Sequence, residues 1–301
     1  MDKKKCLVVG AGFVGGTCYK AFVDLEGWDV LIYDKDPENS LLQKEFEEEI
    51  NWRDIKSAKD ADLVFVCTPT PMIKQTGECY TGIVEAVIKE VRVFNQNCWI
   101  CIKSTVPPGT TQKLHEKYKN VCFNPEFLTE KNAFNDFVDL PYQIIGYPEL
   151  MPGLFDSLDN PAEQLYKDAY VQGKVRGGKH ILSMTSTQAE MVKYTRNTYL
   201  ATRLSFFNEI KQICDKLDIP YELMKYFAGL DDRVGRHYND IDPDEPEWSG
   251  SCLPKDIRSL IFQAKQLGVN PLVLQAVWDK NIEVAKKKTW ENLEGRAVIE
   301  K

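Results

Sequence analysis

The sequence Cys6-Leu7-Val8-Val9-Gly10-Ala11-Gly12-Phe13-Val14-Gly15 lies near the start of this 301-residue chain and sets its architecture. Its apolar half reads as a short buried strand, and a helix is expected from about Phe13 to Leu25. The glycines permit a tight turn, close approach of a pyrophosphate to the backbone, and close helix–strand packing. The helix N-terminus supplies amide donors to the phosphates. We therefore predict a dinucleotide-binding turn whose contacts are Gly10, Gly12, Phe13, Val14 and Gly15.

Asp34 strengthens this prediction. The segment Trp28 to Tyr33 reads as the second strand, and Asp34 follows it, about twenty residues beyond the glycine turn. A carboxylate at that place can bind the ribose diol of a dinucleotide. Because it would repel a 2′-phosphate, Asp34 favours NAD over NADP, and the neighbouring Lys35 makes that preference moderate. NAD is therefore the expected cofactor.

Strands and helices continue to alternate up to about residue 147. Further apolar strands are expected at 63–67, 99–102 and 143–146. Near-continuous apolar strands separated by helices indicate a parallel sheet covered on both faces. From about residue 150 the pattern becomes helical. We predict an α/β chain, with a Rossmann-type doubly wound NAD-binding domain at 1–180 and an all-helical central, dimerisation domain at 181–301.

The helical part contains one long helix and one long loop. The sequence Thr187-Gln188-Ala189-Glu190 matches a capping box and predicts a helix that runs to Leu217. A loop rich in Asp, Pro and Gly follows at 229–249, and its length favours a functional role. Two further helices are expected to start at Pro254 and Pro271.

Net charge and composition limit the classes of partner that the protein is expected to bind. The formal net charge is −7, so nucleic acid and anionic membranes are poor candidates. The apolar runs are too short to span a bilayer, and the N-terminus leads into a strand instead of a signal peptide. The nine cysteines form no disulfide framework, which indicates reduced thiols and a cytoplasmic location.

Cys98 and Cys101 have the spacing of a redox or metal pair. They lie in a segment that reads as a strand, where residues three apart point to opposite faces. We expect both to be core residues, and the sequence offers no further ligand pattern for a metal.

The sequence Gly250-Ser251-Cys252-Leu253-Pro254-Lys255-Asp256 places a thiol where a helix begins. The apolar residues that follow have helical spacing, and Pro254 suits a first helical position. The positive end of the helix dipole and the charge of Lys255 favour the thiolate, which is the nucleophilic form. A small, inert core cysteine is the alternative, and this motif alone leaves both open.

Five other polar residues are candidates for a binding or catalytic site. Lys193 and Asn197 lie four apart on the long helix and share a face, so they could stabilise an oxyanion or form a solvated surface. Glu126 and Glu130 follow a strand-like segment, near the sheet edge at which such folds bind ligands. They could equally belong to an ordinary loop or helix cap. Thr105 follows another strand at the same edge.

Together these motifs resemble those of the nucleotide-sugar dehydrogenases. The matching segments are the glycine turn, Thr68–Pro71, Ser104–Pro107, Asn124–Leu128, Lys193–Glu209, Asp232–Gly235 and the Cys252 motif. They occur in the family's order over nearly the whole chain. The family also carries a third, C-terminal nucleotide-binding domain, and these 301 residues end where it would begin.

The resemblance implies NAD-dependent oxidation of a nucleotide sugar, with UDP-glucose as the expected substrate, at C6 to the uronic acid. Cys252 would attack the intermediate aldehyde as a nucleophile and form a thiohemiacetal. A second oxidation would give a thioester, which water would hydrolyse. A covalent adduct is needed because it keeps the aldehyde from escaping between the two steps.

The resemblance also implies a role for each residue of the site. Lys193 and Asn197 would hold the reacting oxygen, and Glu126 would be the base for hydrolysis. Asp256 would order the water with Thr105. Thr105, Glu130 and Lys255 would touch the cofactor, and the substrate contacts would be Phe127, Leu128, Lys193, Asn197, Gly250 and Arg233, the last acting across a homodimer interface.

The chain departs from the family before the cysteine. Trp248 and Ser249 replace part of a glycine-rich approach, after an acidic insertion at 240–247. Two other functions remain open. A 3-hydroxyacid dehydrogenase of similar architecture also pairs Lys with Asn four residues on, but needs neither Cys252 nor Glu126. A non-catalytic protein that binds NAD or a nucleotide sugar would not need the reactive groups.

Overall fold

The computed structural model describes residues 2–45, 49–148 and 160–301. The chain divides into two compact units. The first comprises Met1–Thr70 with Thr81–Lys193, and the second comprises Pro71–Tyr80 with Tyr194–Lys301. The segment 71–80 therefore belongs with the later part of the chain, although it follows a strand of the first unit.

The first unit is built on a seven-stranded sheet in the order β2-β1-β3-β5-β6-β7-β8. The strands are β1 (Lys4–Val9), β2 (Trp28–Tyr33), β3 (Leu63–Val66), β5 (Trp99–Ile102), β6 (Val121–Phe123), β7 (Gln143–Tyr147) and β8 (Ile181–Thr185). All neighbouring pairs are parallel except β6 and β7, which meet antiparallel at Phe123 and Gly146. The predicted Rossmann-type sheet is confirmed. Strand β6 is the strand-like segment expected before Glu126, whereas β8 was not indicated by the sequence pattern.

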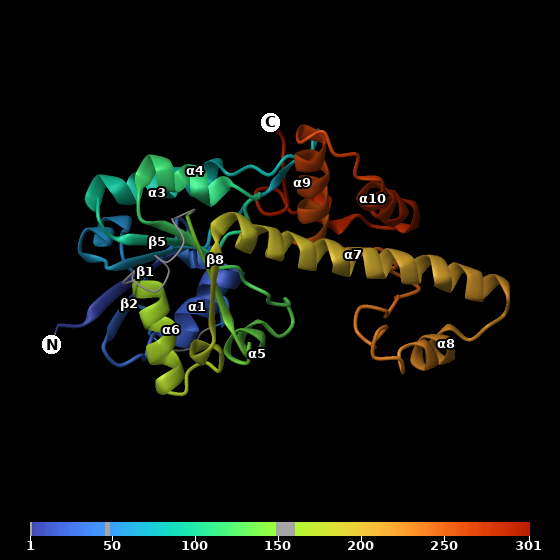
Figure 1. The fold of residues 1–301 in the computed structure, drawn as a ribbon, viewed down its shortest axis with the longest axis horizontal. Helices are drawn as coiled ribbons and strands as arrows, with labels where there is room; N and C mark the ends of the chain where they lie inside the picture. The colour runs from blue at the N-terminus through green and yellow to red at the C-terminus, as the bar shows by residue number, and fades with distance from the viewer. Residues whose placement is uncertain (1, 46–48, 149–159) are drawn as a thin grey trace. The chain divides into compact units, whose positions relative to one another are not determined.

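Helices cover both faces of this sheet (Figure 1). The helices are α1 (Phe13–Phe22), α2 (Leu41–Glu45), α3 (Gly82–Phe94), α4 (Thr110–Tyr118), α5 (Ala133–Val138) and α6 (Pro161–Val171), and short 3-10 turns lie at Pro37–Asn39, Ile55–Asp60 and Gly177–Lys179. One core contains side chains of α1, α5 and α6, and the other contains those of α3 and α4. Cys101 belongs to the first core and Cys98 to the second, as their spacing on a strand predicted.

The long helix α7 (Ser186–Lys216) begins in the first unit and continues into the second. Its capping box is formed by Thr185 and Gln188: the Gln188 N–H donates to Thr185 Oγ1 at 3.2 Å, and the Thr185 N–H donates to Gln188 Oε1 at 3.0 Å. The predicted box at Thr187 and Glu190 is therefore wrong by two residues. The reason is that Thr185 ends β8, so its extended backbone suits an N-cap.

The second unit contains the rest of α7 with α8 (Tyr221–Ala228), α9 (Leu253–Gln266) and α10 (Leu272–Val284), and a 3-10 turn at Thr289–Asn292. It also holds a small parallel sheet of β4 (Met72–Ile73) and β9 (Val298–Ile299). Trp278 packs against Trp248 and Trp290, with ring centroids 6.0 Å and 5.9 Å apart. In the described part of the chain, no helix is both long and apolar enough to cross a membrane.

Candidate active site

The glycine turn has two positions that must be glycine and one that is open. Gly10 has φ +101°, and a Cβ there would lie 2.6 Å from the Cys67 carbonyl oxygen. A Cβ on Gly15 would lie 1.8 Å from the Gly10 carbonyl oxygen. A Cβ on Gly12, in contrast, would meet nothing within 4 Å. The backbone at Gly12 and Phe13 is therefore open to a ligand at the N-terminus of α1, which fits a pyrophosphate.

Asp34 lies against this turn. Its Oδ2 accepts a hydrogen bond from the Ala11 N–H at 2.6 Å, and its Oδ1 accepts one from the Asp36 N–H at 2.9 Å. The carboxylate is thus held at the end of β2 beside the glycine turn, as a ribose-binding carboxylate should be.

A pocket of about 320 Å³ adjoins the turn and has the size of a small-molecule site. Its lining comes from Gly12 and α1 (Phe13, Gly16, Thr17, Lys20), from α2 (Leu41, Leu42) and from residues 130–135. Glu130 therefore lines the same pocket as Gly12 and Phe13. The cations Lys20 and Lys131 are additional lining residues; Lys20 could have been found from its spacing of four from Gly16.

Glu126 and Lys193 form a buried ion pair. Lys193 Nζ lies 2.6 Å from Glu126 Oε1 and donates to the Glu126 carbonyl oxygen at 2.7 Å. The Leu128 N–H donates to Glu126 Oε2 at 2.8 Å. Burial favours the neutral carboxyl, but the charge of Lys193 and these hydrogen bonds outweigh it and lower the pKa of Glu126. Glu126 is therefore an ionised carboxylate that can accept a proton.

Lys103 is a buried cation that the sequence analysis did not single out. Its Nζ lies 2.6 Å from Asn124 Oδ1, 3.2 Å from the Tyr166 hydroxyl and 5.6 Å from the Phe65 ring centroid. Its charge also contributes to the lowered pKa of Glu126. The signal in the sequence was a lysine directly after the apolar strand β5.

Thr105 follows the same strand. Its carbonyl oxygen accepts a hydrogen bond from Thr70 Oγ1 at 2.7 Å, and Ser104 Oγ donates to the Thr68 carbonyl oxygen at 2.7 Å. The segments after β3 and β5 are therefore tied together at the carboxyl ends of their strands, where ligands of such folds bind.

In the second unit, Cys252 is the N-cap residue of α9 and is partly exposed. Its carbonyl oxygen accepts from the Asp256 N–H at 3.0 Å, which closes the first turn, and Pro254 stands in that turn. The predicted position of the thiol at a helix start is confirmed. The thiol therefore lies where the helix dipole favours negative charge.

Two polar residues of the first turns of α9, Lys255 and Asp256, and Asn197 of α7 form a hydrogen-bonded cluster. Lys255 Nζ lies 2.6 Å from Asp256 Oδ1, and Asn197 Nδ2 donates to Asp256 Oδ2 at 2.6 Å. All three are buried. Burial would lower the pKa of Lys255, but the negative charge of Asp256, and after it that of Cys252, raises the pKa above its usual range. Lys255 thus stays positively charged close to the thiol.

The loop before Cys252 is held by side chains of its own unit. The Trp248 indole Nε1–H donates to Ser205 Oγ at 2.9 Å, and the Trp248 N–H donates to Asn281 Oδ1 at 2.9 Å. Trp248, which departs from the family pattern, is therefore a core residue. Gly250 follows with φ +76°, a conformation that favours glycine.

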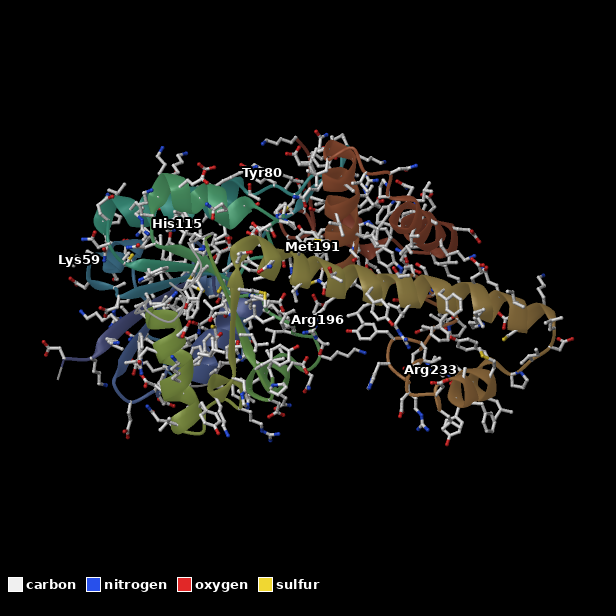
Figure 2. All side chains as sticks on the ribbon, viewed as in Figure 1. Lys59, Tyr80, His115, Met191, Arg196 and Arg233 are labelled. Carbon is white, nitrogen blue, oxygen red and sulfur yellow. The ribbon has the colours of Figure 1, made fainter. Side chains whose placement is uncertain are left out.

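Arg233 points into solvent from the loop after α8 (Figure 2). Its side chain is 90% exposed and its Nη2 lies 2.5 Å from Asp231 Oδ2. The loop itself is tied to α7, because Arg203 donates to the carbonyl oxygens of Val234 and His237 at 2.7 Å and 2.8 Å. Arg233 is therefore an exposed cation on an anchored loop.

Two family models match the chain. The NAD binding domain of the UDP-glucose/GDP-mannose dehydrogenase family matches residues 40–169, and the central domain of the same family matches residues 187–283. Residues 40–169 contain the strands β3, β5, β6 and β7 of the sheet and start after the glycine turn, and residues 187–283 contain the Cys252 motif.

Relatives agree with this family. A UDP-glucose 6-dehydrogenase of Rickettsia typhi is 32% identical over 230 residues, which are 74% of this chain and 50% of that protein. The chain thus spans half the length of this relative. A UDP-glucose 6-dehydrogenase of Campylobacter jejuni is 29% identical over 94% of this chain and 73% of its own length.

Solved structures show the same fold. A UDP-glucose dehydrogenase from Pyrobaculum islandicum superposes with a TM-score of 0.77 at 27% identity, over 93% of this chain and 68% of that one. A 3-hydroxyisobutyrate dehydrogenase of Mycobacterium tuberculosis also superposes, with a TM-score of 0.63, over 93% of both chains, but at 13% identity this shows a shared fold alone. Because both domain models come from one family and follow its order, the chain belongs to the UDP-glucose/GDP-mannose dehydrogenase family and contains its NAD-binding and central domains.

Proposed function

We propose that this chain oxidises a nucleotide sugar at C6 to the uronic acid, with NAD as cofactor and UDP-glucose as the first substrate to test. The observation that carries the proposal is Cys252 at the N-cap of α9, beside the charged Lys255. Oxidation of an alcohol to a carbonyl needs no thiol, whereas oxidation to an acid benefits from a covalent adduct that retains the aldehyde. The names of the two relatives favour UDP-glucose.

The residues around the glycine turn fit the cofactor. The backbone at Gly12 and Phe13 would receive the pyrophosphate, Asp34 the ribose diol, and Glu130 would contact the cofactor from the adjoining pocket. NAD, when bound, accepts one hydride in each of the two oxidation steps.

The sugar carbon changes as follows in the proposed reaction. The C6 alcohol loses a hydride and a proton and becomes an aldehyde. The Cys252 thiolate adds to the aldehyde carbon, and protonation of the oxygen gives a thiohemiacetal. Loss of a second hydride and a proton gives a thioester, and water replaces the sulfur to release the acid and the thiol.

The charged groups have separate roles. Lys193 and Asn197 would hold the reacting oxygen and stabilise its negative charge. Glu126, ionised beside Lys193, would take a proton from the hydrolytic water. Asp256 would order that water with Thr105. Support for these roles comes from the burial and the ionised state of Glu126 and the hydrogen bond from Asn197 to Asp256.

We also propose that two copies pair through an apolar strip on the second unit. On α7 the strip comprises Tyr199, Phe206, Ile213 and Leu217, whose spacing puts them on one helix face. Leu223, Tyr226 and Phe227 of α8 are also exposed, and the proposed strip includes them, so that all seven of its side chains are exposed. Exposed apolar area of this kind marks an interface, and identical copies pair most often about a two-fold axis. Arg233 would then reach the substrate of the partner.

All nine cysteines are free thiols. This supports the proposal that the protein works in a reducing compartment, the cytoplasm.

The reaction is tested by mixing purified protein with NAD and UDP-glucose and following NADH by absorbance. Two NADH per sugar are expected, together with uronic acid. One NADH per sugar would indicate an alcohol-only dehydrogenase of the 3-hydroxyacid type. No NADH with any of several nucleotide sugars would indicate a binding protein. Cys252→Ser is expected to abolish acid formation, and a fully active serine variant would contradict the thioester route.

A further inference from the structure

The carboxylate of Glu190 caps a helix other than its own. Its Oε2 accepts from the Gly109 N–H at 2.6 Å and its Oε1 from the Thr111 N–H at 2.8 Å. These amides stand at the start of α4, and Glu190 itself is 0% exposed. Gly109 is the N-cap residue of α4 with φ +91°, and it has no side chain to cap the helix. The cap therefore comes from α7.

Gly109 ends the short segment that carries Thr105. The other end of this segment is already tied down, because Ser104 Oγ donates to the Thr68 carbonyl oxygen and Thr70 Oγ1 donates to that of Thr105. With Glu190 at Gly109, both ends of the segment are held. At the end nearer α4, the Thr110 N–H and hydroxyl also donate to the Pro107 carbonyl oxygen, at 3.0 Å and 2.6 Å. Glu190 is the side chain that joins this end to α7.

The next turn of α7 contacts the segment after β6, which carries Glu126. Lys193, three residues after Glu190, binds Glu126 at 2.6 Å. The helix packs closely on the sheet at this point, since a Cβ on Gly146 of β7 would lie 2.7 Å from the Ala189 Cβ. Successive turns of α7 therefore contact, through Glu190 and Lys193, the segments that follow β5 and β6.

We propose that Glu190 is a positioning residue, which holds the Thr105 segment at a set place relative to Glu126 and Lys193. The proposal rests on the proposed role of Thr105 at the cofactor. It goes beyond that role, because Glu190 is fully buried and would act through Gly109 and Thr111. A cap that only stabilises α4 would leave cofactor binding unchanged once the protein is folded.

The test is a double-mutant cycle on the dissociation constant of NAD, measured by titration of the full chain. Glu190→Ala is expected to weaken NAD binding about tenfold, because the binding free energy must then also order the Thr105 segment. In the Thr105→Ala background, the same substitution should change binding by less than about twofold, because coupled residues are non-additive. Equal effects in both backgrounds would overturn the proposal.

A matched control separates positioning from lost stability. Asn160 is the buried N-cap residue of α6, and its Oδ1 accepts from the Ala162 N–H at 2.8 Å. Asn160→Ala also removes a helix cap and should leave NAD binding unchanged. If it weakens binding as much as Glu190→Ala does, Glu190 is only a structural cap. Should Glu190→Ala fail to fold, Glu190→Gln keeps the size and one acceptor oxygen and completes the same cycle.

The proposed reaction can fail without affecting this result. Absence of turnover with every nucleotide sugar would refute the proposed function, whereas the NAD-binding cycle would still decide the role of Glu190. Where turnover is measured, Glu190→Gln should raise the KM for NAD and leave the KM for the sugar within about twofold of the native value.

Discussion

Asn197 Nδ2 lies 2.6 Å from Asp256 Oδ2, and this hydrogen bond joins α7 to the start of α9 in the second unit. Asp256 uses its other oxygen for Lys255. One carboxylate therefore holds an amide and a cation next to Cys252. The three groups are therefore held in one arrangement, because a buried amide or charge that lost its partner would cost free energy.

Removal of Asp256 should destabilise the fold. Asp256→Ala leaves the buried Lys255 ammonium without its carboxylate, and breaking a buried pair in this way costs about 3–5 kcal/mol. The matched control is Asp215→Ala, which breaks the exposed pair with Lys211 and should cost less than about 1 kcal/mol. Urea denaturation of both variants measures the free energies of unfolding, and equal values would contradict the ionised pair at Asp256.

Loss of the Glu126 carboxylate should stop the reaction after the thioester. Glu126→Gln keeps the size of the side chain but removes the proposed base, so hydrolysis should slow by about 10²–10⁴-fold. The variant should release two NADH per protein in a burst and retain the sugar on Cys252. Intact-mass spectrometry would detect the adduct. Continued turnover at the native rate, with no adduct, would assign the base to another group.

Two glycines of the turn should respond differently to alanine. Gly15→Ala would put a Cβ 1.8 Å from the Gly10 carbonyl oxygen, and the turn cannot accommodate it. We expect a protein that folds poorly or melts at a much lower temperature. Gly12→Ala has open space and φ −77°, so it should keep its melting temperature but bind NAD weakly. Thermal melts and NAD titration distinguish the two, and intact NAD binding in Gly12→Ala would contradict a pyrophosphate at that place.

Glu190 should make stability depend on pH. Burial raises the pKa of Glu190 to about 7, although hydrogen bonds from Thr111 and Gly109 act in the opposite direction. The pKa of Glu190 is therefore higher in the folded protein than in the unfolded chain. Below about pH 4 the carboxyl is neutral in both states, and its full contribution to the free energy of unfolding is present. This contribution is lost as the pH rises through 7. Relative to Glu190→Gln, the native protein should lose about 3 kcal/mol of unfolding free energy across this range. Urea titrations at several pH values measure the difference, and a constant difference would contradict the raised pKa.

The apolar strip should control self-association. Phe206→Asp puts a charge in the middle of the strip on α7, where a paired copy would bury it unpaired. Sedimentation should then show a native dimer and a monomeric variant. The control is Val93→Asp on α3 of the first unit, which is 72% exposed and outside the strip. A native monomer, or a Phe206→Asp variant that still pairs, would remove the strip as the interface.

Features of the fold that depend only on residues close together in the sequence were predicted correctly. The glycine turn, the strands at β1, β2, β3, β5 and β7, and the thiol at the start of α9 all follow from short patterns of apolar spacing and backbone freedom. Strand β6 was expected only as the strand-like segment before Glu126. Strand β8 was missed, since its sequence ILSMT is partly polar and no residue in it is fully buried, so it lacks the continuous apolar run of a buried strand. The pair β4 and β9 was missed for a different reason: its strands are two residues each and more than two hundred residues apart.

The pairing of the buried charges was beyond the sequence alone. Glu190 was assigned to a capping box on its own helix, but Thr185 and Gln188 form that box and Glu190 caps α4. Lys103 directly follows the apolar strand β5, but this position did not show which groups would pair with it. In both cases the partner lies far along the chain, so its identity depends on how the sheet and helices pack.

The sequence by itself determined the dinucleotide turn, the alternation of strands and helices, and the types of reactive side chain, because spacing and composition act within a few residues. Only the tertiary structure decided that Glu126 is ionised by Lys193, that Asp256 joins Asn197 to Lys255, and that Glu190 serves α4. Each of these requires that segments far apart in the chain be packed together, and the burial that results determines which charges must be paired.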